Sequence, residues 1–202
     1  MFWDRVAFLY DIFAYGINRK ANKLMCSAVE SWIEPSDTVL ECACGTGLLS
    51  YVIADKCARL TATDFSANML KRAERKCRKL SNIEFRKGNI LSIEYPDESF
   101  DAVVAANVIH LLEDPYKALS ELIRVCRKGG RIIIPTYINR TEKGRTNSIT
   151  GAIGKAGAGF KREFSFESYK EFFDKAGYRN AEFRLCYGRV LCAVAMIRRE
   201  SD

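Results

Sequence analysis

Short apolar runs alternate with amphipathic stretches along most of this chain. The runs rich in apolar and β-branched residues predict strands at 38–42, 59–64, 82–89, 100–107 and 131–137. The stretches between them place apolar residues at helical spacing and predict helices at 47–56, 67–80 and 116–127. This regular alternation predicts an α/β fold, a doubly wound, mostly parallel sheet with helices on both faces.

Residues that favour helix starts and ends flank one of these predicted helices. Asp114-Pro115 precedes the helix at 116–127, and Pro is favoured in a first helical turn. We expect the helix to end at Gly129-Gly130, where the next strand begins.

The C-terminal part follows a different pattern. Ser165 is a candidate N-cap for a helix over 166–176. Two strand-like runs follow at 178–187 and 189–197, with Gly188 alone between them. This spacing predicts an antiparallel hairpin.

Two segments are less regular than the rest. Residues 138–163 are polar and rich in glycine, which predicts a long loop or lid. At the N-terminus, apolar residues recur at helical spacing and predict an amphipathic helix. This stretch lacks the basic leader and small-residue cleavage site of a signal peptide.

Composition is ordinary for a soluble globular domain, with 48% hydrophobic and 28% charged residues in 202. No apolar run is long enough to span a bilayer. The eight cysteines form no Cys-x-x-Cys pair and there is one histidine, so no zinc site or other metal site is expected. With no secretion signal, reduced thiols and a cytoplasmic location are the simplest account.

The net charge of +7 is modest, and it would favour an anionic substrate, nucleic acid or an anionic membrane surface. The densest basic cluster lies on the predicted helix at 67–80 and comprises Lys71, Arg72, Arg75, Lys76, Arg78 and Lys79. A charge run on a helix is usually a solvated face, so charge alone identifies no partner.

The most informative stretch is VLECACGTGLL at 39–49, which leaves a strand, turns tightly and enters a helix. Small residues there let the backbone approach a ligand closely, and the helix N-terminus offers unpaired amide donors. Asp64 ends the next strand, about twenty residues further on, where a carboxylate can accept hydrogen bonds from the ribose of an adenosine cofactor.

Two adenosine cofactors compete for this arrangement. A dinucleotide enzyme would need Gly-x-Gly-x-x-Gly, but the run here is Glu41-x-Ala43-x-Gly45-x-Gly47, with no glycine three residues later. Glu41 is poorly placed beside a pyrophosphate and is compatible with a cationic ligand. S-adenosylmethionine carries a sulfonium and an amine but no phosphate, so the charges favour it.

An ordered series of motifs carries a family resemblance: ECACGTG, ATDFSANML, KGNI, SFDAVVAANVIHLLEDP and RKGGRIII. Together they resemble the class I S-adenosylmethionine-dependent methyltransferases, and among these the small-molecule branch with the ubiquinone and menaquinone C-methyltransferases. The resemblance covers residues 36–136 well. It implies a Rossmann-like sheet of seven strands with the last one antiparallel, and S-adenosylhomocysteine as product.

The resemblance also implies which residues contact the cofactor. The methionine end would lie against Glu41, Ala43, Cys44, Gly45 and Gly47. The ribose and adenine would lie against Asp64, Phe65, Met69, Asn89 and Ile90. Asn107 would lie near the transferred methyl group, and Tyr10 resembles an N-terminal tyrosine that covers the cofactor.

Two of these positions depart from the family pattern. Ala43 stands where the family often has glycine, and Asn89 where it often has aspartate. Because an amide can both donate to and accept from adenine, we expect binding to survive with weaker affinity.

We expect one domain over 1–202. Its parts would be an N-terminal helical cap (1–35), a cofactor-binding core (36–137), the lid or loop (138–163) and a C-terminal helix and hairpin (164–202).

Methyl transfer from a sulfonium is an in-line displacement, which needs alignment and exclusion of water rather than a metal. A general base helps only if the acceptor must lose a proton. His110 is the candidate base, although it could equally pack or cap the turn after the fourth strand; Tyr15 and Tyr137 are weaker alternatives.

The chemical class of the methyl acceptor is restricted mainly by motifs that the sequence lacks. After the fourth strand there is no Asn-Pro-Pro-aromatic run of the kind that serves flipped bases, so a small-molecule acceptor is favoured over nucleic acid. Two alternatives stay open: a peripheral-membrane quinone-precursor C-methyltransferase, and a non-catalytic cofactor-binding or interaction protein. The sequence leaves the oligomeric state open.

Overall fold

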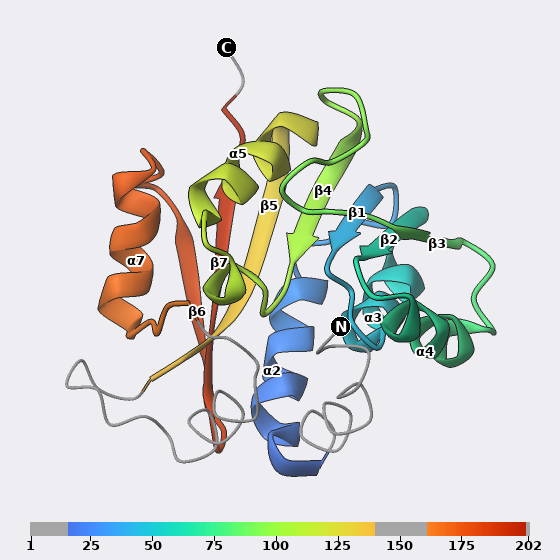
Figure 1. The fold of residues 1–202 in the computed structure, drawn as a ribbon, viewed down its shortest axis with the longest axis horizontal. Helices are drawn as coiled ribbons and strands as arrows, with labels where there is room; N and C mark the ends of the chain where they lie inside the picture. Colours follow the sequence, from blue (N-terminus) through green and yellow to red (C-terminus); the bar gives the residue numbers. More distant parts are fainter. Residues whose placement is uncertain (1–15, 140–160, 201–202) are drawn as a thin grey trace.

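A computed structural model describes residues 16–139 and 161–200, which form one seven-stranded sheet between two helical layers (Figure 1). The strands are β1 (Thr38–Cys42), β2 (Arg59–Asp64), β3 (Ile83–Lys87), β4 (Phe100–Ala105), β5 (Cys126–Ile138), β6 (Glu182–Cys186) and β7 (Leu191–Arg198). Their order across the sheet is β3-β2-β1-β4-β5-β7-β6. β7 runs antiparallel to both neighbours, whereas β3, β2, β1, β4 and β5 pair in parallel. The predicted fold class is therefore confirmed, including the antiparallel C-terminal hairpin.

The helices divide between the two faces of the sheet. One face is covered by α2 (Arg19–Glu30), α3 (Leu48–Lys56) and α4 (Ala67–Cys77). The other is covered by α5 (Pro115–Val125) and α7 (Phe166–Lys175), with the short 3-10 helix η2 (Ile109–Leu111) beside α5. Each face of the sheet has its own hydrophobic core, and neighbouring residues of β5 contribute to both. Ile133 packs toward α2, whereas Ile132 and Ile134 pack toward α5 and α7.

Side-chain caps fix where several helices begin. Asp114 Oδ1 accepts from the Lys117 amide at 2.9 Å, with Pro115 in the first turn. Ser165 and Ser168 form a reciprocal capping box at the start of α7. Both helix starts agree with the sequence prediction, because each cap satisfies amides that the helix itself leaves unpaired.

The predicted end of α5 at Gly129-Gly130 was wrong. The helix ends at Val125, and the chain enters β5 at once, with a register shift opposite Phe100 and Ala102. Gly130 is needed for close approach, because a Cβ there would lie 2.7 Å from the Asp101 carbonyl oxygen. This glycine therefore serves a bulge in the strand rather than a helix end.

Some predictions fall on residues that the structure does not describe. The amphipathic N-terminal helix with Tyr10 and Tyr15, and nearly all of the proposed lid, lie outside the described residues. Within 16–139 and 161–200, no helix is both long and apolar enough to cross a bilayer.

Candidate functional site

A pocket of about 390 Å³ opens at the carboxyl ends of the parallel strands β1, β2 and β4. Ligands bind at this edge in doubly wound sheets, where the turns into the helices spread apart. Its wall is formed by Ala43, Gly45, Asp64, Phe65, Met69, Gly88, Asn89, Ile90, Ala106, Asn107, Val108, Leu111 and Leu112. Eight of the twelve predicted cofactor contacts lie on this wall, brought together from four separate segments of the chain.

The turn between β1 and α3 has an unusual backbone. Ala43, Gly45 and Gly47 all have positive φ, at 55°, 57° and 80°. A Cβ on Gly47 would lie 3.0 Å from Cα and Cβ of Ala73, so this glycine lets the turn pack on α4. Glycine adopts left-handed backbone without a steric penalty, which explains why the related family favours it at position 43. Ala43 retains the conformation at a cost of about 1 kcal/mol.

Asp64 joins the two turns that frame the pocket. Its Oδ2 accepts from the Gly45 amide at 2.8 Å, and its Oδ1 accepts from the Ser66 amide at 2.8 Å. A carboxylate offers about four acceptor sites, more than these two amides use. The side chain is thus held rigidly on the wall, with the chemistry needed to accept hydrogen bonds from a sugar diol.

Glu41, Cys44 and Gly47 lie beneath the wall rather than on it. Glu41 is 2% exposed, and its Oε2 accepts from Ser50 Oγ at 2.5 Å. Burial raises the pKa of the Glu41 carboxyl to about 8, which outweighs the lowering effect of the Ser50 hydrogen bond. Glu41 therefore holds its proton at neutral pH, and a cationic group nearby would favour its ionised form.

Asn107 presents an unsatisfied acceptor beside the pocket. Its backbone is left-handed, with φ of 52°, and its amide donates to the Pro135 carbonyl at 2.8 Å. Its Nδ2 lies 3.9 Å from Met25 Sδ, whereas its Oδ1 is buried with no hydrogen-bond partner among the described residues. A buried acceptor without a donor costs about 1–3 kcal/mol. A ligand that brings an ammonium group would remove this cost, so Asn107 and Glu41 fit the cationic amino-acid end of S-adenosylmethionine.

The opposite end of the pocket is more apolar and more open. Phe65 is 50% exposed, and Lys87 Nζ lies 5.4 Å from the centre of its ring. Met69 and Ile90 are buried beside it. Asn89 Oδ1 already accepts from the Leu91 amide at 3.0 Å, so its oxygen is engaged in the turn. This end is suited to a flat aromatic ring such as adenine.

Sequence reasoning missed five residues of the wall. Gly88 permits close packing, since a Cβ there would lie 2.9 Å from Thr63 Cβ. The other four are apolar and follow β4: Ala106, Val108, Leu111 and Leu112. Their place just after a buried strand, at the ligand-binding edge, was the available signal.

His110 and Tyr137 are not on the wall of this pocket. His110 is 5% exposed, and its Nδ1 lies 3.4 Å from Thr136 Oγ1. Burial lowers the pKa of His110 to about 4, so the imidazole is neutral at pH 7. The Tyr137 hydroxyl donates to Asn22 Oδ1 at 3.0 Å, beneath α2. Both residues border a separate small hollow with Arg162, so a role as general base stays a prediction.

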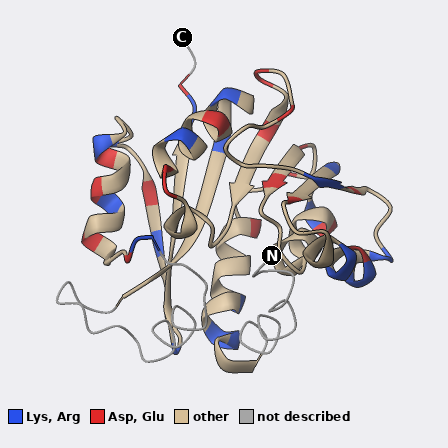
Figure 2. Cartoon of the chain, in the orientation of Figure 1, with Lys and Arg blue, Asp and Glu red and all other residues tan. Residues whose placement is uncertain are grey.

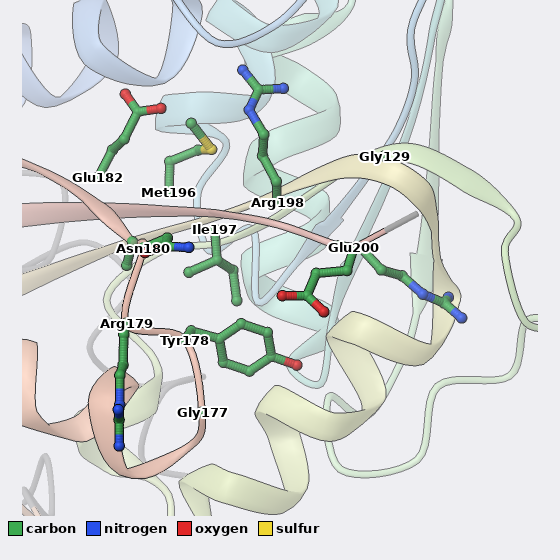
Figure 3. Close-up of a pocket in the computed structure, with 12 residues that line it drawn as sticks. Gly129, Gly177, Tyr178, Arg179, Asn180, Glu182, Met196, Ile197, Arg198 and Glu200 are labelled. Carbon is green, nitrogen blue, oxygen red and sulfur yellow. The ribbon is translucent and has the colours of Figure 1, made fainter. Parts of the chain in front are cut away.

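Another hollow lies elsewhere in the described residues. It measures about 540 Å³ and is bordered by Gly129 of β5, the chain before β6 and the end of β7 (Figure 3). Acidic and basic side chains both line it, including Glu182, Arg179 and Arg198. It lies at the amino end of β5 and β6, away from the edge where parallel strands present ligand-binding turns, and none of the predicted site residues reaches it.

The cysteines are free thiols, and seven of the eight are buried. Burial raises the pKa of Cys42 to about 12 and that of Cys44 well above its ordinary value. Among the described residues, no group of three or more His, Cys, Asp and Glu side chains could hold a metal ion. Both thiols of the motif are therefore packing residues in this structure.

Comparison with known proteins shows which family and which curated relatives this chain resembles. Residues 40–134 match the family described as "Methyltransferase domain". A demethylmenaquinone methyltransferase of Renibacterium salmoninarum is 33% identical over 131 residues, which are 65% of this chain and 53% of that protein. A phosphatidylethanolamine N-methyltransferase of Cereibacter sphaeroides is 35% identical over 120 residues, which are 58% of each chain. The chain thus matches about half the length of these curated relatives.

A solved structure shares the fold. The N-methyltransferase NodS of Bradyrhizobium japonicum WM9, in complex with S-adenosylhomocysteine, superposes with a TM-score of 0.68 at 21% identity. The superposition covers 91% of this chain and 87% of NodS.

Proposed function

Since the chain belongs to the class I S-adenosylmethionine-dependent methyltransferase family, we propose that it transfers a methyl group from S-adenosylmethionine to a small-molecule acceptor. The pocket at the carboxyl edge carries this proposal, because its wall combines a rigidly held carboxylate with a buried amide oxygen that lacks a donor. A cofactor with a ribose and a cationic amino acid would bring a diol to the carboxylate and a donor to the Asn107 oxygen, which has none among the described residues. NodS is bound to the product form of this cofactor.

Each part of the site has a distinct role in the proposal. Asp64 would bind the ribose, with Phe65 and Met69 against the adenine. Asn107 would hold the ammonium group, and the buried Glu41 beneath the wall would supply a negative charge once it ionises beside that cation. The cofactor supplies an activated methyl group, and the chain's residues orient it and exclude water from the displacement. Tyr10 would cover the cofactor, and His110 would act as base only for an acceptor that loses a proton.

The acceptor side of the wall is apolar. Val108, Leu111 and Leu112 offer no charged partner, so they favour an acceptor with an apolar body. This observation supports the second candidate, a peripheral-membrane C-methyltransferase of a quinone precursor. The relatives' names, which give demethylmenaquinone and phosphatidylethanolamine as acceptors, point in the same direction. We also propose one domain over residues 1–202 and a cytoplasmic location, which the free thiols support.

Calorimetric titration tests the cofactor directly. We expect S-adenosylmethionine and S-adenosylhomocysteine to bind and NAD not to bind. Asp64→Ala should weaken adenosyl binding by about 10- to 100-fold, because it removes charge-assisted hydrogen bonds. Asp55→Ala is the matched control, since Asp55 is exposed on α3 away from the pocket.

Three outcomes separate the candidates. Binding of NAD, or of neither adenosyl ligand, would contradict the proposal. Adenosyl binding without release of S-adenosylhomocysteine on a panel of quinols, phospholipids and small amines would favour the non-catalytic alternative. Turnover on the quinols alone would favour the second candidate.

A further inference from the structure

The positive charge of this protein is concentrated in one short segment. Residues 71–87 contain eight Lys and Arg and two Glu, and so carry +6 of the chain's net +7. The segment comprises most of α4, the turn after it and β3, the edge strand of the sheet. In the cartoon, the blue that marks Lys and Arg is concentrated on α4 (Figure 2). The rest of the chain sums to +1, although residues 138–163 carry +4 of their own, so the segment 71–87 has the larger local excess of positive charge.

The packing of α4 turns these charges outward. Met69, Leu70, Ala73 and Cys77 form the buried stripe of the helix. Its opposite side exposes four cations, Lys71, Arg75, Arg78 and Lys79, and Lys87 at the end of β3 is exposed on the same face of the sheet. We call these five residues the basic surface.

One acidic side chain lies among the cations of the basic surface. Glu74 is exposed on α4, three residues after Lys71 and four before Arg78, and offsets one of the five positive charges. Glu84 of β3 is engaged elsewhere, since it pairs with Arg86 at 2.6 Å and lies 3.7 Å from Arg59. The Arg75 Nε donates to the Lys71 carbonyl at 3.1 Å, which fixes that side chain along the helix without cancelling its charge.

From this surface we infer that the protein docks on an anionic lipid bilayer through α4 and β3. The surface is the outer side of a helix with the end of the edge strand beside it. Single-stranded nucleic acids are held instead in basic grooves with stacked aromatic platforms. A bilayer with mobile anionic headgroups needs no groove and no fixed pairing geometry, and each Lys or Arg near it contributes attraction.

Phe65 connects the basic surface to the pocket. Phe65 is half exposed at the pocket wall, and Lys87 of the basic surface lies over its ring at 5.4 Å. A bilayer held by the basic surface would therefore lie near the mouth of the apolar pocket. Delivery of a lipophilic acceptor from the membrane follows only if the proposed function also holds.

Vesicle sedimentation tests the docking. The full chain is mixed with vesicles of equal parts phosphatidylglycerol and phosphatidylcholine, and with vesicles of phosphatidylcholine alone. We expect binding to the anionic vesicles only, with release as salt is raised. The variant Arg75→Glu/Arg78→Glu/Lys79→Glu should lower the partition coefficient at least ~10-fold.

Two further variants keep the test decisive. Lys117→Glu/Lys175→Glu/Arg179→Glu makes the same charge change at exposed positions around α5 and α7, and should retain most of the binding. Arg75→Gln/Arg78→Gln/Lys79→Gln gives a milder variant if the charge-reversed protein unfolds, which circular dichroism would reveal. It should also bind more weakly than the control.

The docking is overturned if anionic vesicles do not bind, or if both glutamate variants lose binding equally. It is also overturned if a single-stranded oligonucleotide binds more tightly than the vesicles and competes for the same arginines. Titration of each variant with S-adenosylmethionine reports separately on the proposed function, because none of the substituted residues lies on the pocket wall.

Discussion

The buried carboxyl of Glu41 should make the stability of this protein fall as the pH rises. Glu41 is 2% exposed, with a pKa raised by burial from the ordinary 4.5 to about 8. Between these two values the unfolded chain releases this proton and the folded protein retains it. The free energy of unfolding therefore declines from about pH 4.5 and levels off above about pH 8.

The size of this effect follows from linkage. Each unit of pKa difference corresponds to about 1.4 kcal/mol, so the step between pH 5 and pH 7.5 should cost about 3 kcal/mol. In Glu41→Gln the side chain keeps its shape and an oxygen that can accept from Ser50 Oγ, but it no longer titrates. We expect this variant to be about 4 kcal/mol more stable than the native protein at pH 7.5 and about 1 kcal/mol more stable at pH 5.

Urea denaturation across pH 5–8, without cofactor, measures the difference. Glu74→Gln is the matched control, because Glu74 is an exposed glutamate on α4 and should leave the pH dependence unchanged. Parallel stability curves for the native protein and Glu41→Gln would refute the reasoning, since they would mean that Glu41 is ionised in the folded protein.

Two more predictions concern the turn and the histidine. Gly47→Ala should destabilise the protein by about 2 kcal/mol or more, because the backbone is left-handed and the new Cβ would meet Ala73 at 3.0 Å. Gly45→Ala has a similar backbone but open space around its Cβ, so thermal denaturation should show a cost of only about 1 kcal/mol, and equal costs would contradict the packing argument. His110 has a pKa lowered by burial to about 4, so its own contribution to the free energy of unfolding should fall by about 2 kcal/mol between pH 7 and pH 4.5, opposite in sign to that of Glu41, because the unfolded chain takes up this proton first. In urea denaturation, the stability of a His110→Gln variant should therefore gain about 2 kcal/mol relative to the native protein between pH 7 and pH 4.5, and equal changes would contradict the low pKa.

Local sequence patterns, such as apolar periodicity and helix caps, predict most of the fold. The strand at 59–64 and the caps at Asp114 and Ser165 form where predicted, because apolar periodicity and side-chain caps depend on near neighbours in the chain. The glycine pair after α5 misled the prediction. Gly130 lies so close to the Asp101 carbonyl on a neighbouring strand that a Cβ would not fit. Local sequence does not reveal this contact.

The sequence motifs also indicated the methyltransferase resemblance and where the candidate cofactor contacts would lie. Asp64 could be placed from the motif, since the end of a parallel strand in such a sheet always reaches the ligand edge. The protonation states of Glu41 and His110 could not be predicted from the sequence. They depend on how completely other segments exclude water from these side chains. The orphaned oxygen of Asn107 is likewise a product of tertiary packing, where α2 and β5 surround an amide that is far from both in the chain. Sequence alone thus determined which groups are present at the site, and only the packing of distant segments decided their charge and the partners they lack.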